Sequence, residues 1–176
     1  MLLKTMNKKI WIREIEFSDI KTINTWRNNQ QEVEFLCTNF RFINEEIDQE
    51  WYKNYLENRF ENIRLAICSN NKELIGLLYI LNIDYINRNA ELSIWIGNSI
   101  DRRKGYGEFG CKAALDHVFN NINLNKLYLK VLETNEAAVS LYKKLGFKID
   151  GISRESLFKN GKYLNVLEMS ILKSEF

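Results

Sequence analysis

The spacing of hydrophobic and polar positions changes several times along the chain, and each change marks an expected element. Apolar residues alternate with polar ones over residues 9–16, which predicts a strand. A helix is expected next, capped by Ser18 or Asp19 and running to about Arg27. A second helix is expected from Asn44 to about Asn58, because an N-cap residue there precedes two acidic residues in the first turn.

Three strand-like runs follow one another in the middle of the chain. They cover residues 63–69, 74–83 and 90–97, and asparagine-rich turns at 70–71 and 87–89 separate them. Because the connections are short, we expect an antiparallel meander. After a polar loop over 98–104, apolar residues recur at helical spacing from Gly105 to about Asn120.

The last third of the sequence is expected to end in a hairpin. A strand is predicted over 126–132, followed by a helix from Asn135 to Gly146, where glycine is the usual residue beyond a helix end. Two more strands, 147–158 and 163–172, flank an Asn160-Gly161 turn. The order β-α-α-β-β-β-α-β-α-β-β predicts an α/β (α+β mixed) fold in one domain over residues 1–176, with helices on both faces of a mixed sheet.

The composition of the chain argues against a nucleic-acid partner and a membrane partner. The chain has 176 residues, of which 45% are apolar and 27% charged, as in a soluble globular protein. Its 25 basic residues are spread along the sequence and balanced by 23 acidic ones, so no nucleic-acid partner is expected. The first ten residues do not resemble a signal peptide, and no apolar run approaches the roughly 20 residues of a membrane span. We therefore expect a cytoplasmic protein without a membrane partner.

Cysteine and histidine content argues against a metal site. Cys37, Cys68 and Cys111 lie far apart in the sequence, and we expect buried free thiols in a reducing compartment. With a single histidine, His117, and no paired cysteines, a zinc site is disfavoured. His117 falls among apolar helix neighbours and is expected to be a core or interface residue, and the four tryptophans are expected to serve packing.

The segment from Arg102 to Gly107 has the chemistry of a phosphate site. Three cations precede an expected helix that begins at Gly105, and the first backbone N–H groups of that helix lack helical partners. Glycine at 105 and 107 lets a bulky anion approach the main chain. The segment has neither the GK[ST] ending of a P-loop nor the GxGxxG spacing of a dinucleotide site. A solvated charge run is the alternative interpretation.

Four segments together resemble the GCN5-related N-acetyltransferases. Arg102, Gly105 and Gly107 match the R/Q-x-x-G-x-G/A signature of that family. Residues 126–131 resemble its fifth strand, and residues 135–147 its N-x-x-A-x-x-x-Y-x-x-x-G-F segment. Residues 161–166 are similar to the last strand in the branch of ribosomal-protein and spermidine N-acetyltransferases. The resemblance covers residues 74–172, and it implies a single-domain fold whose sheet splays between strands 90–97 and 126–132.

The resemblance implies a site for acetyl-CoA as co-substrate, with no metal. The backbone of the fourth strand would bind the pantetheine arm, and the main-chain amides of the 102–107 loop would bind the pyrophosphate. Asn135 matches a position that contacts the cofactor arm. The implied cofactor-binding residues are Ile94, Trp95, Ile96, Arg102, Arg103, Lys104, Gly105, Tyr106, Gly107 and Asn135.

The same resemblance indicates two catalytic candidates. Tyr142 matches a tyrosine placed near the thioester sulfur, where its hydroxyl would donate to the leaving thiolate. Its alternative role is to complete the apolar stripe of its helix with Ala138 and Leu145. Glu91 is a candidate base acting through water, because an amine near pKa 10.4 must lose a proton. Its alternatives are an exposed strand carboxylate and a salt-bridge partner.

The acceptor amine is left open by the sequence. In this fold the segment 32–42 would wall the acceptor pocket, and Glu32 and Glu34 are candidates to receive a cationic amine. Spermidine acetyltransferases carry a Trp-Phe-Glu-Glu type motif there, whereas this chain has Glu-Phe-Leu-Cys over 34–37. Residues 26–28 and the following helix resemble acetyltransferases of nucleotide-linked amino sugars. A polyamine, an amino sugar and a protein N-terminus all remain possible acceptors.

Two further alternatives and one expectation concern the whole protein. The chain could be a non-catalytic acyl-CoA sensor or scaffold with the same fold, or it could transfer a longer acyl group. A homodimer is expected by family analogy alone.

Overall fold

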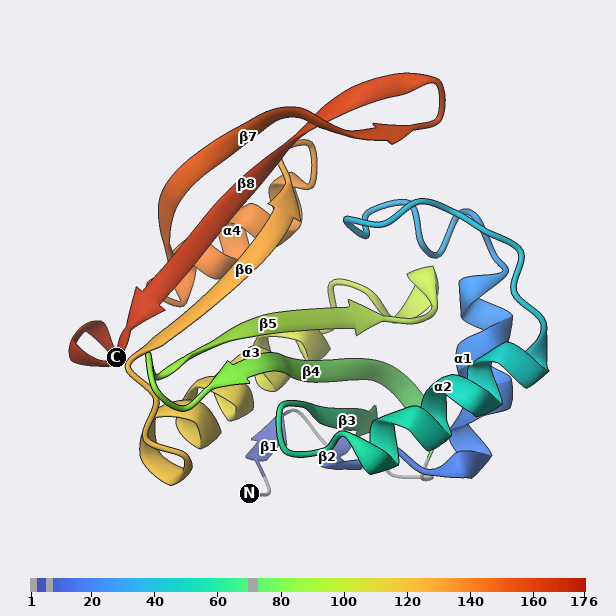
Figure 1. Cartoon of the computed structure of the whole chain (residues 1–176), viewed down its shortest axis with the longest axis horizontal. Helices are drawn as coiled ribbons and strands as arrows, with labels where there is room; N and C mark the ends of the chain where they lie inside the picture. The colour runs from blue at the N-terminus through green and yellow to red at the C-terminus, as the bar shows by residue number, and fades with distance from the viewer. Residues whose placement is uncertain (1–2, 6–7, 70–72) are drawn as a thin grey trace.

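A computed structural model describes residues 3–5, 8–69 and 73–176 and shows a mixed sheet of eight strands (Figure 1). The spatial order is β1-β2-β3-β4-β5-β6-β8-β7, and every neighbouring pair is antiparallel except β5 and β6. The strands are β1 (Leu3–Thr5), β2 (Lys8–Glu14), β3 (Ile63–Cys68), β4 (Leu74–Asp84), β5 (Asn89–Ile96), β6 (Lys126–Leu132), β7 (Lys148–Lys159) and β8 (Lys162–Leu172). The helices are α1 (Ile20–Arg27), α2 (Glu45–Glu57), α3 (Tyr106–Asp116) and α4 (Glu136–Lys144).

The predicted mixed fold with helices on both sheet faces is confirmed, as is the antiparallel meander of β3, β4 and β5. The short strand β1, which pairs with β2, was not predicted. Its three residues are too few to show a hydrophobic period. The turn predicted at 70–71 lies outside the described residues. Among the described helices, none is long and apolar enough to span a bilayer.

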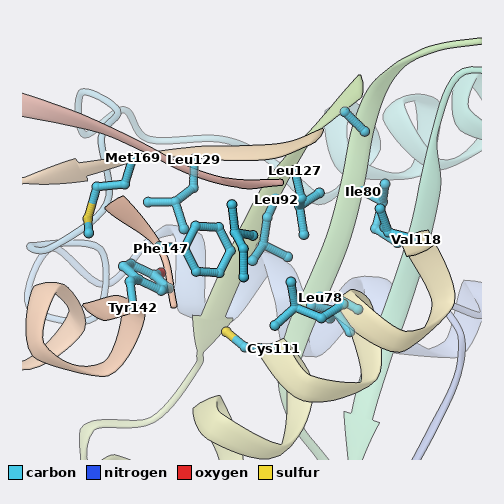
Figure 2. Close-up of a cluster of buried hydrophobic side chains, with 14 of the residues drawn as sticks. Leu78, Ile80, Leu92, Cys111, Val118, Leu127, Leu129, Tyr142, Phe147 and Met169 are labelled. Atoms are coloured by element: carbon cyan, nitrogen blue, oxygen red, sulfur yellow. The ribbon is translucent and has the colours of Figure 1, made fainter. Parts of the chain in front are cut away.

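Two hydrophobic cores lie on opposite faces of the sheet. One is the cluster drawn in Figure 2, in which Cys111 and Val118 of the α3 region pack against Leu78, Leu92 and their neighbours. On the other face, α1 and α2 pack Ile23, Trp26 and Tyr55 against β3 and β4. The expectation of packing tryptophans is confirmed for Trp26, which is 3% exposed and contacts Trp95 edge-on at 5.6 Å between ring centroids.

The cysteines divide between these cores and a loop. Cys68 and Cys111 are buried, as expected, and burial raises the pKa of Cys111 to about 12. The same expectation is wrong for Cys37, which is exposed because its segment forms a loop between α1 and α2 rather than part of a core element. His117 is half-buried, within a single π-helical turn that follows α3.

Several helix ends and turns form as their residue types predict. The side chains of Asn44 and Asn135 accept from the third backbone amide of α2 and of α4, at 3.0 and 3.2 Å. Gly146 beyond α4 has φ +95°, and the Asn160-Gly161 turn has positive φ at both residues, as a type I′ hairpin requires. The expected α1 cap differs, because the carboxylate of Asp19 accepts from the Glu16 amide and from the Arg13 guanidinium.

A buried acid joins α1 to α2. Asp48 is fully buried, pairs with Arg27, and accepts from the Asn24 amide at 2.7 Å. The side-chain amide of Asn28 donates to the Ile43 carbonyl at 2.7 Å, so these residues close the polypeptide between the two helices. The 26–28 segment resembles one of amino-sugar acetyltransferases. In this chain its Arg27 and Asn28 side chains hold α2 and the segment before it against α1.

The parallel pair β5–β6 is short, and it opens the sheet. Its paired residues are Asn89 with Lys126, Ala90 with Leu127, and Glu91 with Tyr128. Beyond Glu91 the two strands diverge, and Figure 1 shows them as the two arms of a V. This is the splay that the family resemblance implied.

Candidate active site

A cleft of about 930 Å³ opens between the diverging strands β5 and β6. Its walls come from β5, the loop before α3, β6, the start of α4, and the segment between α1 and α2. Most of the candidate residues line it: Glu32, Glu91, Ile94, Trp95, Ile96, Arg102, Arg103, Gly105, Gly107, Asn135 and Tyr142. One cavity therefore brings together residues that are more than a hundred positions apart.

The structure places three candidates elsewhere. Lys104 does not line the cleft, and its ammonium group pairs with Asp101 at 2.9 Å. The side chain of Tyr106 is 5% exposed and belongs to the core beneath α3, so only its main chain is left for a ligand. Glu34 is exposed and lies outside the residues that line the cleft.

The loop before α3 presents its backbone to the cleft. Gly105 is the N-cap residue of α3 and has φ +86°, a left-handed conformation that favours glycine. A Cβ built at Gly107 would meet only Leu141 Cδ2, at 3.6 Å, so this position keeps free space beside the helix start. The first amides of α3 have no intrahelical acceptor, and the positive end of the helix dipole adds to them. The residues present thus fit a pyrophosphate.

Arg102, which was expected to bind acetyl-CoA, contacts Glu32, which was expected to bind the acceptor amine. Its guanidinium donates to the Glu32 carboxylate at 2.7 Å and to the Glu32 carbonyl at 2.8 Å. The Trp95 indole donates to the same carbonyl at 3.2 Å. The carboxylate that was expected to receive an amine is therefore already paired with the arginine of the phosphate loop.

Tyr142 lies both in the hydrophobic core and at the wall of the cleft, a position compatible with either interpretation. The residue is 7% exposed, and its ring contacts Phe147 at 5.7 Å between centroids in the core of Figure 2. It also lines the cleft. Burial raises the pKa of its phenol well above the ordinary value, so the hydroxyl stays protonated and able to donate.

Glu91 lies at the apex of the V. It is the last residue of β5 that pairs with β6, and its carboxylate accepts from the side-chain amide of Asn82 at 3.3 Å. The residue is half-buried and lines the cleft. Within the described residues no ion pair of Glu91 occurs, so the salt-bridge interpretation has no partner there.

Asn135 has a cap role that can be measured apart from any cofactor contact. Replacement by alanine should lower the free energy of unfolding by about 1 kcal/mol, because the Ala138 amide loses its acceptor. Asn135→Asp should keep most of that stability, since aspartate caps equally well. Chemical denaturation of both variants measures this, and equal losses for alanine and aspartate would show that the cap contributes nothing.

Several residues that line the cleft were not among the candidates, and Lys130 of β6 is one of them. Lys130 could have been found, because the alternation along 126–132 already placed it opposite the buried leucines. Phe35 and Cys37 also line the cleft, and they belong to the 32–42 segment that was expected to wall the acceptor pocket.

Comparisons with known proteins agree with this geometry. The family model described as acetyltransferase (GNAT) domain matches residues 9–148. A spermidine N(1)-acetyltransferase of Vibrio cholerae is 34% identical over 173 residues, which is 97% of each chain. A putative ribosomal N-acetyltransferase of Bacillus subtilis is 28% identical, over 58% of this chain and 56% of its own length.

Solved structures give the same result. The crystal structure of a Vibrio cholerae spermidine N-acetyltransferase in complex with CoA and spermine superimposes with a TM-score of 0.87, at 31% identity, over 94% of this chain and 96% of that one. A dodecameric structure of spermidine N-acetyltransferase from the same organism has a TM-score of 0.81, at 30% identity, over 94% of each chain.

Proposed function

This chain belongs to the GNAT family of acetyltransferases, and we propose that the amine it acetylates is a primary amine of a polyamine. The protein is an N-acetyltransferase that uses acetyl-CoA as co-substrate. The structural observation that supports acetyl transfer is the cleft between β5 and β6. It joins a glycine-rich helix start at one wall to Tyr142 and Glu91 at others.

The polyamine is favoured over the other amines by the extent of the similarity. The spermidine N(1)-acetyltransferases of Vibrio cholerae and Escherichia coli align with 97% and 94% of this chain, at 34% and 28% identity, and a solved structure from the first organism, in complex with CoA and spermine, covers 94% of it. The longer match includes the segment that borders the amine side of the cleft. The absence of the Trp-Phe-Glu-Glu type motif means that this chain would recognise the amine with other residues. A candidate is the carboxylate of Glu91, which would attract a cation.

The chemistry follows from the residues in the cleft. When bound, acetyl-CoA supplies an activated thioester, so no covalent bond to the protein is required. We assign to Tyr142 the donation of a hydrogen bond or proton to the thiolate that leaves when the carbon–sulfur bond breaks. Glu91 takes up, through water, the proton that the amine nitrogen loses as its bond to the acetyl carbon forms. The amides after Gly105 bind the pyrophosphate, and Asn135 contacts the cofactor arm.

A thiol-release assay over a panel of amines tests the acceptor. Spermidine and spermine should give saturable CoA release, while an amino sugar and a peptide with a free N-terminus should give kcat/KM values lower by at least about tenfold, a difference of roughly 1.4 kcal/mol. Turnover that is highest with the peptide or the amino sugar would contradict the polyamine assignment. Acetyl-CoA binding without release on any amine would support the sensor alternative.

Self-association is proposed on the same basis. One solved relative is described as dodecameric, and this chain matches 94% of it. We infer that this protein forms a homo-oligomer, of which the expected homodimer would be one form. Light scattering coupled to gel filtration gives the molar mass, and a monomer at micromolar concentration would contradict the inference.

A further inference from the structure

Lys159 is one of the few charged residues that are buried within the described part of the chain. It ends β7, beside the Asn160-Gly161 turn, and is only 7% exposed. Burying an ammonium group costs free energy unless hydrogen bonds replace its water. Here its Nζ donates to the carbonyl oxygens of Val33 and Leu36, at 2.7 and 2.8 Å. Burial lowers the pKa of this lysine, as expected for an ammonium group removed from solvent.

These bonds connect two segments that are far apart in the sequence. Val33 and Leu36 lie in the segment between α1 and α2, whereas Lys159 belongs to the β7–β8 hairpin. The next residue of the hairpin, Asn160, accepts from the side-chain amide of Gln30 at 3.0 Å. Figure 1 shows the hairpin tip reaching toward this segment across the open side of the V.

The same segment is held from the other arm of the V. Glu32 is bound by Arg102 and by the Trp95 indole, which belong to the β5 side of the cleft. Residues 32–36 therefore bridge the two arms, with one anchor on each. The residues that line the cleft at and beyond the second anchor are Leu36, Cys37 and Thr38.

We propose that Lys159 is a positioning residue, which fixes the 33–38 segment as the amine-side wall of the cleft and so determines how the acceptor amine is held. This inference deepens the proposed acetyl transfer to a polyamine and rests on it. Lysine supplies here what an apolar side chain of equal length could not. Such a side chain would fill the space but would leave two carbonyl groups without their donor. The lysine does not touch the reacting atoms, so its effect should fall on amine binding.

The test compares Lys159→Met with Lys162→Met, an exposed lysine on the same hairpin. In the methionine variant at 159, KM for the amine should rise by about tenfold or more, since two hydrogen bonds from a charged donor are lost. KM for acetyl-CoA should change by less than about twofold, because the proposed pyrophosphate site, residues 102–107, lies on the other arm. Lys159→Arg, which keeps a charged donor, should restore part of the amine KM.

Hydrogen exchange provides a readout that needs no turnover. The amides of residues 33–38 should exchange faster in Lys159→Met than in the wild type or in Lys162→Met, both with and without acetyl-CoA. An unchanged amine KM, equal rises in both KM values, or unchanged exchange at 33–38 would each overturn the proposal. If the wild type acetylates another amine of the panel instead, the polyamine assignment fails, and the KM comparison is made with that amine.

Discussion

Replacing Tyr142 with phenylalanine should lower kcat about a hundredfold, at the lower end of what a positioned acid contributes. The hydroxyl is removed, while the ring that packs against Phe147 is kept. Burial raises the pKa of this tyrosine, so the acid form persists as the pH rises through the range in which an exposed tyrosine would ionise. Wild-type kcat should therefore show no loss attributable to this group up to about pH 10.

Three measurements separate this effect from a loss of structure. Acetyl-CoA affinity by isothermal titration should be nearly unchanged in Tyr142→Phe, and the thermal midpoint should remain close to that of the wild type. Tyr163→Phe, at an exposed tyrosine of the β7–β8 hairpin, is the matched control and should keep full turnover. Full turnover by Tyr142→Phe itself would show that the residue only completes the apolar stripe of α4.

Replacing Gly107 with valine should weaken acetyl-CoA binding at least about a hundredfold while the protein still folds. A Cβ at this position meets only Leu141 Cδ2, at 3.6 Å, so the branched side chain enters the open cleft. There it would occupy the space next to the amides that we propose bind the pyrophosphate. Losing two such charge-assisted hydrogen bonds costs about 3–6 kcal/mol, which corresponds to a hundredfold or more.

Gly151→Val is the control for this substitution. A Cβ at Gly151 meets no atom within 4 Å, and this glycine lies in β7, away from the cleft. Titration calorimetry should give a wild-type dissociation constant for this variant, and both variants should show cooperative unfolding. Wild-type acetyl-CoA affinity in Gly107→Val would mean that the cofactor binds elsewhere.

Most of the fold could be predicted, because its signals are local. Alternation and helical spacing located the strands of the meander and the helix before Asn120, and side-chain caps at Asn44 and Asn135 formed as expected. The prediction failed where a distant partner decides the outcome. Asp19, a predicted cap, accepts instead from Arg13 across the end of β2. Cys37 was expected to be buried, but it lies exposed in the loop between α1 and α2, and the position of that loop depends on its distant contacts.

The candidate site could be predicted in part for the same reason. The proposed pyrophosphate site, residues 102–107, is one continuous stretch with glycines and a helix start, so six consecutive residues were enough to predict it. The amine wall is assembled from contacts over long sequence separations. Arg102 pairs with Glu32, and Lys159 binds the carbonyls of Val33 and Leu36. No local pattern in residues 28–60 encodes those partners, and so Glu32 was assigned to the amine.

The most direct test of the central conclusion is the stoichiometry of acetyl transfer to spermidine. Purified protein is incubated with acetyl-CoA and spermidine, CoA thiol release is followed, and the amine product is identified by mass spectrometry. The expected result is one N-acetylated spermidine for each CoA released, with release abolished when the amine is omitted. Saturable acetyl-CoA binding without any acetylated amine, or CoA release without an N-acetyl product, would contradict it.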